Sequence, residues 1–364
     1  MDIKTLSDIC NYRKETLPSN KCDRMTFIST ENMLPNKAGV VISAKCPTYG
    51  NVSKYYPGDV LVSNIRPYFK KIYLADKEGT CSNDVLVFFP KREVCTSDFL
   101  FCLLSTDAFF AHATKTAKGT KMPRGDRSAI MGYQINWVPI NEQSGISEPI
   151  LNVYRKIKLN EKINDNLQKQ AEAIYSRLFI DARNCNQVPL KNIANITMGQ
   201  SPAGHSCSEK NEGTVFYQGR AEFGFRFPTR RLFTTEPKRM AKVGDILLSV
   251  RAPVGDTNVA YEDCCIGRGL SAIESKTGEP SFLLYTLRYL HHQFEVFNAE
   301  GTVFGSINKE QLNNFQINLP PKDKIKEFES IVRPMDDLIR MNFKENNLLN
   351  ELKEKLLLNF FSNK

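Results

Sequence analysis

The 364-residue sequence predicts an α+β protein built as a pseudo-twofold internal repeat, with two similar globular domains and a pair of long helices that form a coiled coil. Two observations lead to this prediction. Short strings from the first half recur in the same order in the second half, and each half ends in a long segment with heptad-spaced apolar residues. We therefore place globular domains at residues 1–146 and 187–320, and helices at residues 147–186 and 321–364.

The internal repeat has a step of half the chain length. Gln134-Ile135-Asn136 returns as Gln316-Ile317-Asn318, a step of 316 − 134 = 182 residues, and Gly119-Thr120 returns as Gly301-Thr302 with the same step. A repeat of this length is a duplicated domain, because solenoid repeats have periods of about 20–50 residues. Two similar domains on one chain indicate two similar things to be bound.

Within each half, short β-like runs alternate with turns that contain Gly, Pro or Asn, and one helix follows. Such a frame presents its loops rigidly, which suits binding. The predicted strands are Val60–Asn64, Val85–Phe89, Ile246–Val250 and Asn258–Tyr261, and the predicted helices are Asp98–His112 and Phe282–Phe297.

The two long segments carry matching interruptions in their apolar stripes. The first has no glycine and one proline, Pro149, which we expect in the first helical turn. Asn160 and Asn164 interrupt the first stripe, and Asn342 and Asn346 interrupt the second 182 residues on. A buried asparagine pairs well only with another polar group, so the recurrence favours asparagines facing asparagines; the alternative places them at a solvated edge. The stripes are Ile150, Val153, Ile157, Leu167, Ala171, Ile174 and Leu178, and Val332, Met335, Ile339, Leu349, Lys353, Leu356 and Phe360.

The net charge of +9 mildly favours a polyanionic partner, and the basic residues gather in two segments. The first contains Gly119, Pro123 and Gly125, which predict a loop. Positive loops contact phosphates, and Arg, Gln and Asn also read base edges; an ordinary solvated surface is the alternative. The candidate DNA-binding residues are Lys115, Lys118, Lys121, Arg124 and Arg127 in the first half, and Gln218, Arg220, Arg226, Arg230, Arg231 and Arg251 in the second.

Motifs for catalysis are missing from the sequence. The string Asn318-Leu319-Pro320-Pro321 departs from the amino-methyltransferase motif by an extra leucine and a missing aromatic residue, and no glycine-rich phosphate loop occurs. Asp263 with Glu274-Ser275-Lys276 is a weak match to a nuclease core. We interpret His292 and Glu295 as the surface of an amphipathic helix. With four histidines and no Cys-x-x-Cys pair, we predict neither a catalytic nor a metal site.

The ten scattered cysteines predict reduced, mostly buried thiols in a cytoplasmic protein. The first residues lack the apolar run of a signal peptide, and no stretch approaches 18 uninterrupted apolar residues. The sequence therefore predicts no membrane segment.

Taken together, several strings resemble the target-recognition domains of Type I restriction–modification specificity subunits. The resemblance covers nearly the whole chain, and the ordered set is specific although each string alone is short. The strings are Gly199-Gln200-Ser201-Pro202, Phe216-Tyr217-Gln218-Gly219, Glu222-Phe223-Gly224, Gly244–Asp256 and Cys265–Leu270 in the second half, and Ile28–Met33 and Gly58–Leu61 in the first.

This resemblance implies two target-recognition domains, each reading one half of a split double-stranded DNA site, separated by two antiparallel helices. It also implies two modification subunits, which bind S-adenosylmethionine and methylate adenine, and separate restriction/translocase subunits. S-adenosylmethionine, ATP and Mg are then expected on those partners, and this chain is expected to be non-catalytic and without a cofactor.

Two alternatives stay open: a self-contained DNA methyltransferase or nuclease fragment, and a structural protein with two binding domains. The first domain lacks close copies of Tyr217-Gln218-Gly219 and Arg251–Asp256. We therefore expect the two domains to read different half-sites.

Overall fold

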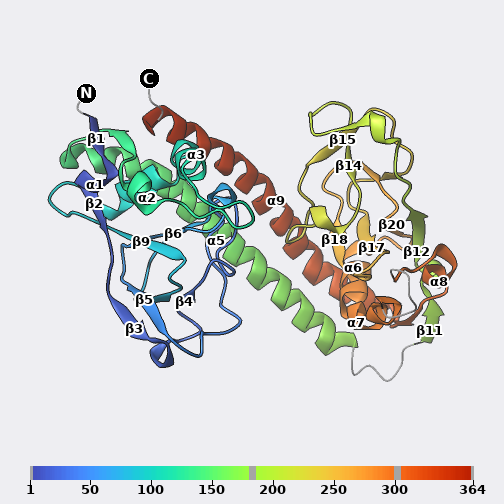
Figure 1. Ribbon diagram of the computed structural model, residues 1–364. Coiled ribbons are helices and arrows are strands. Elements are labelled where there is room, and N and C mark those ends of the chain that lie inside the picture. The colour runs from blue at the N-terminus through green and yellow to red at the C-terminus, as the bar shows by residue number, and fades with distance from the viewer. Residues whose placement is uncertain (1–2, 180–185, 299–304, 362–364) are drawn as a thin grey trace. The chain divides into compact units, whose positions relative to one another are not determined.

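The computed structural model describes residues 3–179, 186–298 and 305–361. The fold separates into two units, one formed by Met1–Asn160 with Glu345–Lys364 and the other by Glu161–Lys344. Each unit holds one α+β domain together with part of each of two long helices, α5 (Ile140–Phe179) and α9 (Lys322–Phe361) (Figure 1). Among the described residues, no helix combines the length and the apolar character needed to cross a membrane.

The first unit contains two four-stranded sheets and a short strand pair. The first sheet, β2-β9-β6-β7, is antiparallel throughout, whereas the second, β3-β5-β8-β4, ends in a parallel pair. The strands are β1 (Ile3–Thr5), β2 (Cys10–Tyr12), β3 (Thr16–Pro18), β4 (Phe27–Ile28), β5 (Asn51–Tyr55), β6 (Val60–Ser63), β7 (Ile72–Leu74), β8 (Gly79–Cys81), β9 (Val85–Pro90) and β10 (Gln134–Asn136). The short helices are α1 (Leu6–Ile9), α2 (Ser97–Leu104), α3 (Asp107–Lys115) and α4 (Arg127–Met131).

The second unit repeats this arrangement. Its sheet β12-β20-β17-β18 is again antiparallel, and its other sheet, β13-β15-β14-β19-β16, again contains one parallel pair. The strands are β11 (Asn186–Pro189), β12 (Ala194–Met198), β13 (Cys207–Ser208), β14 (Thr214–Tyr217), β15 (Leu232–Thr234), β16 (Met240–Ala241), β17 (Ile246–Ser249), β18 (Thr257–Val259), β19 (Cys264–Ile266), β20 (Leu270–Ser275) and β21 (Gln316–Leu319). The short helices are α6 (Pro280–Tyr289), α7 (His291–Phe294) and α8 (Lys309–Asn313).

The predicted α+β repeat is confirmed by this shared topology. In each unit, the repeated Gln-Ile-Asn string forms the strand that precedes a long helix, as β10 and β21. β10 pairs with β1 and β21 pairs with β11, both antiparallel. Gly301-Thr302, the second copy of Gly119-Thr120, lies outside the described residues.

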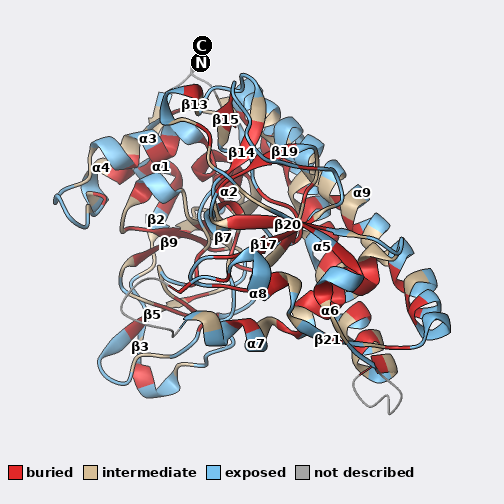
Figure 2. Ribbon diagram, turned by 90° about the vertical axis from the view of Figure 1, so that its right-hand side faces the viewer, coloured by how far each residue is buried: buried red, intermediate tan, exposed pale blue. Residues whose placement is uncertain are grey.

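Central strands of each domain are buried on both faces, because two cores share them. Alternate side chains of a strand point to opposite faces. In β17, Ile246 and Leu248 pack into the core beneath α6, and Leu247 packs into the core between the sheets. Burying such a side chain contributes about 1.5–3 kcal/mol. Figure 2 shows the neighbouring strand β20 as buried along most of its length.

The prediction of a single helix in each domain is wrong. The first, expected at Asp98–His112, is interrupted between α2 and α3, because the Thr106 side chain accepts a hydrogen bond from Phe109 N and caps a new helix there. The second, expected at Phe282–Phe297, is interrupted at Leu290, between α6 and α7.

The two long helices run antiparallel within each unit. In the first unit, Leu357 of α9 shares a core with Ile150 of α5. In the second unit, the ring of Phe328 on α9 contacts the rings of Tyr175 and Phe179 on α5. Later residues of one helix therefore meet earlier residues of the other.

Asparagines meet across the helix pair in both units. In the first, Asn160 Nδ2 donates to Asn346 Oδ1 at 2.9 Å and to Glu345 Oε2 at 2.6 Å. The hydrogen bond from Asn160 lowers the pKa of Glu345, with help from Lys156. In the second, Asn342 Nδ2 donates to Asn164 Oδ1 at 2.8 Å, and both residues are buried. A shift of register would leave these buried amides without partners.

Three details of the long helices differ from the predictions. Helix α5 begins at Ile140, before the expected boundary at residue 147, so Pro149 lies inside it. The buried Gln143 fixes the early start, since its side chain accepts from Thr96 N and donates to Val94 O. At the end of α9, Leu357 is buried and Phe360 is 43% exposed. The buried face of α9 no longer follows the heptad positions at this end, because a helix with 3.6 residues per turn drifts relative to a strict seven-residue repeat.

We predict that single and double substitutions in the Asn164–Asn342 layer have opposite effects. Asn342→Leu leaves the Asn164 amide buried without its partner and should lower the free energy of unfolding by about 1–3 kcal/mol. Asn164→Leu combined with Asn342→Leu should raise it by about 1–2 kcal/mol, because apolar surface replaces both amides. Urea denaturation followed by circular dichroism measures both variants. A double variant as unstable as the single one would show that the pairing is not responsible.

Candidate nucleic-acid interface

The first basic segment runs from Lys115, the last residue of α3, to Arg127, the first residue of α4, so the predicted loop holds for Lys118, Lys121 and Arg124 and not for the two ends. Lys118 and Arg124 bond to each other through both backbone groups, N to O at 2.8 and 2.9 Å, which closes the loop into a narrow turn. Gly119 takes the left-handed conformation there, with φ of +97°. All five basic residues of the segment are exposed.

The cations of this loop outnumber their carboxylate partners. Lys118 forms an ion pair with Asp126, and this hydrogen bond raises the pKa of Lys118. Arg124 lies 3.1 Å from Asp84. Lys121 and Lys115 make no side-chain ion pair or hydrogen bond with the residues that the structure describes. Because exposed pairs contribute only about 0–1 kcal/mol, a polyanion can compete for all of these cations.

In the second unit, three strings that carry the resemblance pack backbone against backbone. Gly267 N donates to Tyr217 O at 2.8 Å. A Cβ at Gly267 would stand 2.9 Å from the Cα of Gln218, and one at Gly199 would stand 2.1 Å from the Gly267 carbonyl oxygen. Only glycine permits such approach. The exposed Gln218 and Arg268 side chains therefore start from a firmly packed backbone.

The arginines of the second basic segment divide into exposed and buried ones. Arg220 pairs with Asp256, Arg230 with Glu262 and Arg231 with Glu222. These three arginine side chains are 48–54% exposed. The hydrogen bonds that these guanidinium groups donate to Glu262 and Glu222 raise the pKa of Arg230 and of Arg231. Arg251 is also exposed, next to the strand end of β17.

Arg226 is a structural residue, and its prediction as a DNA contact is wrong. Its side chain is 3% exposed and lies against Asp336 of α9 and the Tyr285 hydroxyl, which is 2.9 Å away. Burial opposes its charge, but Tyr285 and Asp336 outweigh this effect and raise the pKa of Arg226. Arg226 thus joins the globular domain of the second unit to α9. Its sequence context could not reveal this, because Asp336 lies 110 residues away.

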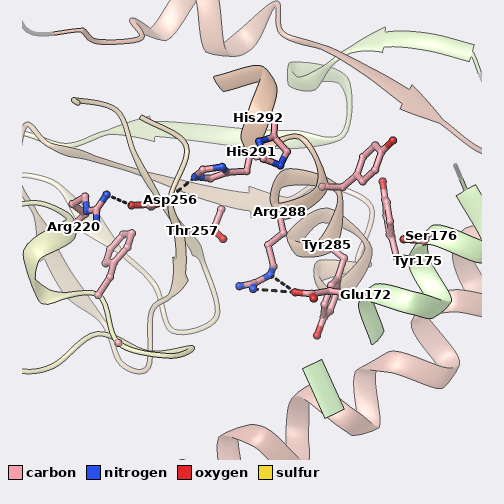
Figure 3. A pocket seen from close by; sticks show the side chains of 13 residues that line it. Glu172, Tyr175, Ser176, Arg220, Asp256, Thr257, Tyr285, Arg288, His291 and His292 are labelled. Carbon is pink, nitrogen blue, oxygen red and sulfur yellow. Dashed lines mark hydrogen bonds and ion pairs between the residues drawn. The ribbon is translucent and has the colours of Figure 1, made fainter. Parts of the chain in front are cut away.

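A pocket of about 660 Å³ lies beside this segment in the second unit (Figure 3). Arg220 and Asp256 line one side, and Arg288 of α6 donates to Glu172 of α5 at 3.0 Å on the other. Each arginine has a carboxylate partner. The lining also carries aromatic rings, from Tyr175, Phe223, Tyr285 and Tyr289.

Sequence analysis did not select Arg268 as a candidate. This exposed arginine stands between Gly267 and Gly269, and its backbone N donates a hydrogen bond to the Ser201 hydroxyl at 3.3 Å. The glycine–arginine–glycine string was the available signal. Of the residues in the weak nuclease match, Asp263 accepts a hydrogen bond from Val243 N at 2.8 Å.

Comparisons with known proteins agree with this arrangement. A family model described as the Type I restriction modification DNA specificity domain matches residues 1–169 and 183–354. A putative type I restriction enzyme MjaX specificity subunit from Methanocaldococcus jannaschii is 40% identical over 164 residues, 44% of this chain and 38% of that protein. The type I restriction enzyme HindI specificity subunit from Haemophilus influenzae is 27% identical over 185 residues, 49% of this chain and 40% of that protein.

These matches span about two fifths of the length of each curated relative. Among solved structures, the Type-I restriction-modification system S subunit from M. genitalium aligns with 100% of this chain and 96% of its own, at a TM-score of 0.62 and 16% identity. That likeness shows a shared fold.

We predict that Arg226→Ala lowers the free energy of unfolding of the second unit by about 3–5 kcal/mol, because it leaves the Asp336 carboxylate half-paired next to buried Tyr285. Arg230→Ala is the matched control: it removes an exposed ion pair and should cost about 0–1 kcal/mol. Thermal unfolding followed by circular dichroism compares the two. Equal losses would contradict a structural role specific to Arg226.

Proposed function

Since the chain belongs to the Type I restriction–modification DNA specificity family, we propose that it is the sequence-specific DNA-binding subunit of a Type I restriction–modification complex. The observation that carries this proposal is the duplicated frame, on which each domain bears exposed cations at its loops. Two similar domains suit a bipartite double-stranded DNA site, with one domain on each half. Long helices suit a spacer between two such sites.

In this proposal, the loop cations contact phosphates, and polar side chains on packed loops read bases. In the first domain, the phosphate contacts come from Lys115, Lys118, Lys121, Arg124 and Arg127. In the other, Gln218, Arg220 and Arg268 reach toward base edges, where Gln pairs with adenine and Arg with guanine. Arg230, Arg231 and Arg251 contribute phosphate contacts. The loops of the two domains differ, which supports different half-sites.

We propose that the partners are two modification subunits and the restriction/translocase subunits, in the cytoplasm. S-adenosylmethionine, ATP and Mg then bind to those partners, and this chain does no chemistry itself. Exposed apolar side chains on α9 support the chain's role as a scaffold. Met341 is 67% exposed in the second unit, and Leu348 is 59% exposed in the first. Apolar side chains on a helix surface suit packing against helices of another protein.

Substitutions in one domain should change recognition at one half-site. Gln218→Ala should relax base preference at one position by about 1–3 kcal/mol. Lys121→Ala should weaken binding to all sequences alike and reduce the slope of affinity against salt by about one. Methylation-sensitive sequencing of cells that express the whole complex reads the target, and fluorescence anisotropy reads the affinity. An unchanged target in Gln218→Ala would remove this residue from base recognition.

Copurification tests the scaffold role. When expressed with the genes beside its own, the tagged chain should bring down a protein with methyltransferase motifs. Purified alone, it should bind DNA without transferring methyl groups from labelled S-adenosylmethionine. The self-contained methyltransferase would be favoured instead if the isolated chain transferred methyl groups, and if Asn318→Ala abolished this transfer without changing DNA binding.

A further inference from the structure

Three ligand-type side chains converge at the end of α7 in the second unit. His291 and His292 belong to α7, and Glu295 begins the following turn, η6 (Glu295–Asn298). One ligand atom from each lies within 4.8 Å of the others. His291 Nδ1 is 3.6 Å from one Glu295 oxygen, and His292 Nδ1 is 3.6 Å from the other.

A fourth residue fixes which nitrogen of His291 carries its proton. His291 Nε2 lies 3.0 Å from Asp256 Oδ1, and the two side chains face each other in Figure 3. An ionised carboxylate only accepts hydrogen bonds, so Nε2 is the donor. In the neutral ring, Nδ1 then carries a lone pair that faces the Glu295 carboxylate. In this state two acceptors face each other without a hydrogen between them, and either a proton on Nδ1 or a bound metal cation relieves the repulsion between them.

The spacing of these atoms suits a transition metal. Zinc binds histidine nitrogen and carboxylate oxygen at about 2.0–2.2 Å in a tetrahedron, which places neighbouring ligand atoms about 3.4 Å apart. The two observed separations of 3.6 Å, each to a different oxygen of Glu295, are close to this value and too long for hydrogen bonds. One ligand atom from each of the three residues lies within 4.8 Å of the others, so a small closing movement of these exposed side chains would complete the tetrahedral spacing. In such sites, the second nitrogen of a metal-bound histidine usually donates a hydrogen bond to a carboxylate, which fixes the orientation of the ring. Asp256 supplies that carboxylate for His291.

We propose that His291 Nδ1, His292 Nδ1 and the Glu295 carboxylate bind one divalent transition-metal ion of the Zn²⁺ class, with Asp256 orienting His291. Three protein ligands leave a fourth position for water. The sequence predicted no metal site, because the chain has few histidines. It could not show that Asp256, in the loop between β17 and β18, lies next to one of them. Its orienting residue Asp256 also pairs with Arg220, which the proposed function assigns to base recognition, so the site is tested by metal binding and not by DNA binding.

The site lies beside the pocket described above, since His291 and His292 both line it. His292 is 88% exposed and Glu295 51% exposed at the side chain, so the ion can enter from solvent. The same exposure means that substitutions at these two residues leave the core of the unit intact.

Cobalt titration of the full-length, untagged, chelator-treated protein tests the proposal. Co²⁺ should bind with a stoichiometry of one, give the intense visible bands of tetrahedral coordination and be displaced by Zn²⁺. The near-ultraviolet band of cobalt–thiolate bonds should be absent, since no cysteine belongs to the site. The affinity for Co²⁺ should fall in acidic buffer, because protons compete with the metal for the histidine nitrogens.

Variants assign the ligands. His292→Ala and Glu295→Ala should each weaken Co²⁺ binding at least tenfold, and Asp256→Asn should weaken it about tenfold, as an orienting partner does. His205→Ala is the matched control: this 77% exposed histidine lies near a single carboxylate, Glu236, and should leave binding unchanged. Circular dichroism verifies that each variant is folded. The proposal is overturned if no Co²⁺ binds, if binding survives His292→Ala and Glu295→Ala, or if the spectrum shows thiolate ligands.

Discussion

The pairing of α5 with α9 is the constraint on which each unit depends. The seam between the two helices contains asparagines that face each other, and these asparagines pair well in one register only. Each globular domain in turn packs on both helices of its unit. A slip along the seam would therefore misplace the domain as well as the helices.

Each domain is also tied to α9 by a buried cation. In the first unit, Lys37 is 9% exposed and lies 3.0 Å from Glu354 and 3.1 Å from Asp107. In the second unit, Arg226 makes the corresponding connection to Asp336. The contacts differ in residue type and position, although both join a recognition domain to the same helix. Buried charges cost desolvation energy, so they are retained where orientation matters more than stability gained from burial.

Sequence patterns predicted the features that depend on local periodicity. The repeated strings, the heptads and the central strands are all visible within short windows, and the observed β6, β9 and β17 fall where short apolar runs between turns predicted them. Features that depend on a distant partner were missed. Arg226 looked like its exposed neighbours because its carboxylate lies on another element, and the early start of α5 depends on backbone groups around Val94 and Thr96.

Strand β17 has a consequence for how this protein family can change. Because successive residues of the strand enter different cores, inserting one residue within it would exchange their destinations and disrupt both. Beyond the strand ends, inserted residues meet no such penalty, since loops tolerate changes in length. An insertion is therefore expected to be tolerated in the loops beyond β17 and not within the strand, so the loops can change in length while the two cores keep their packing.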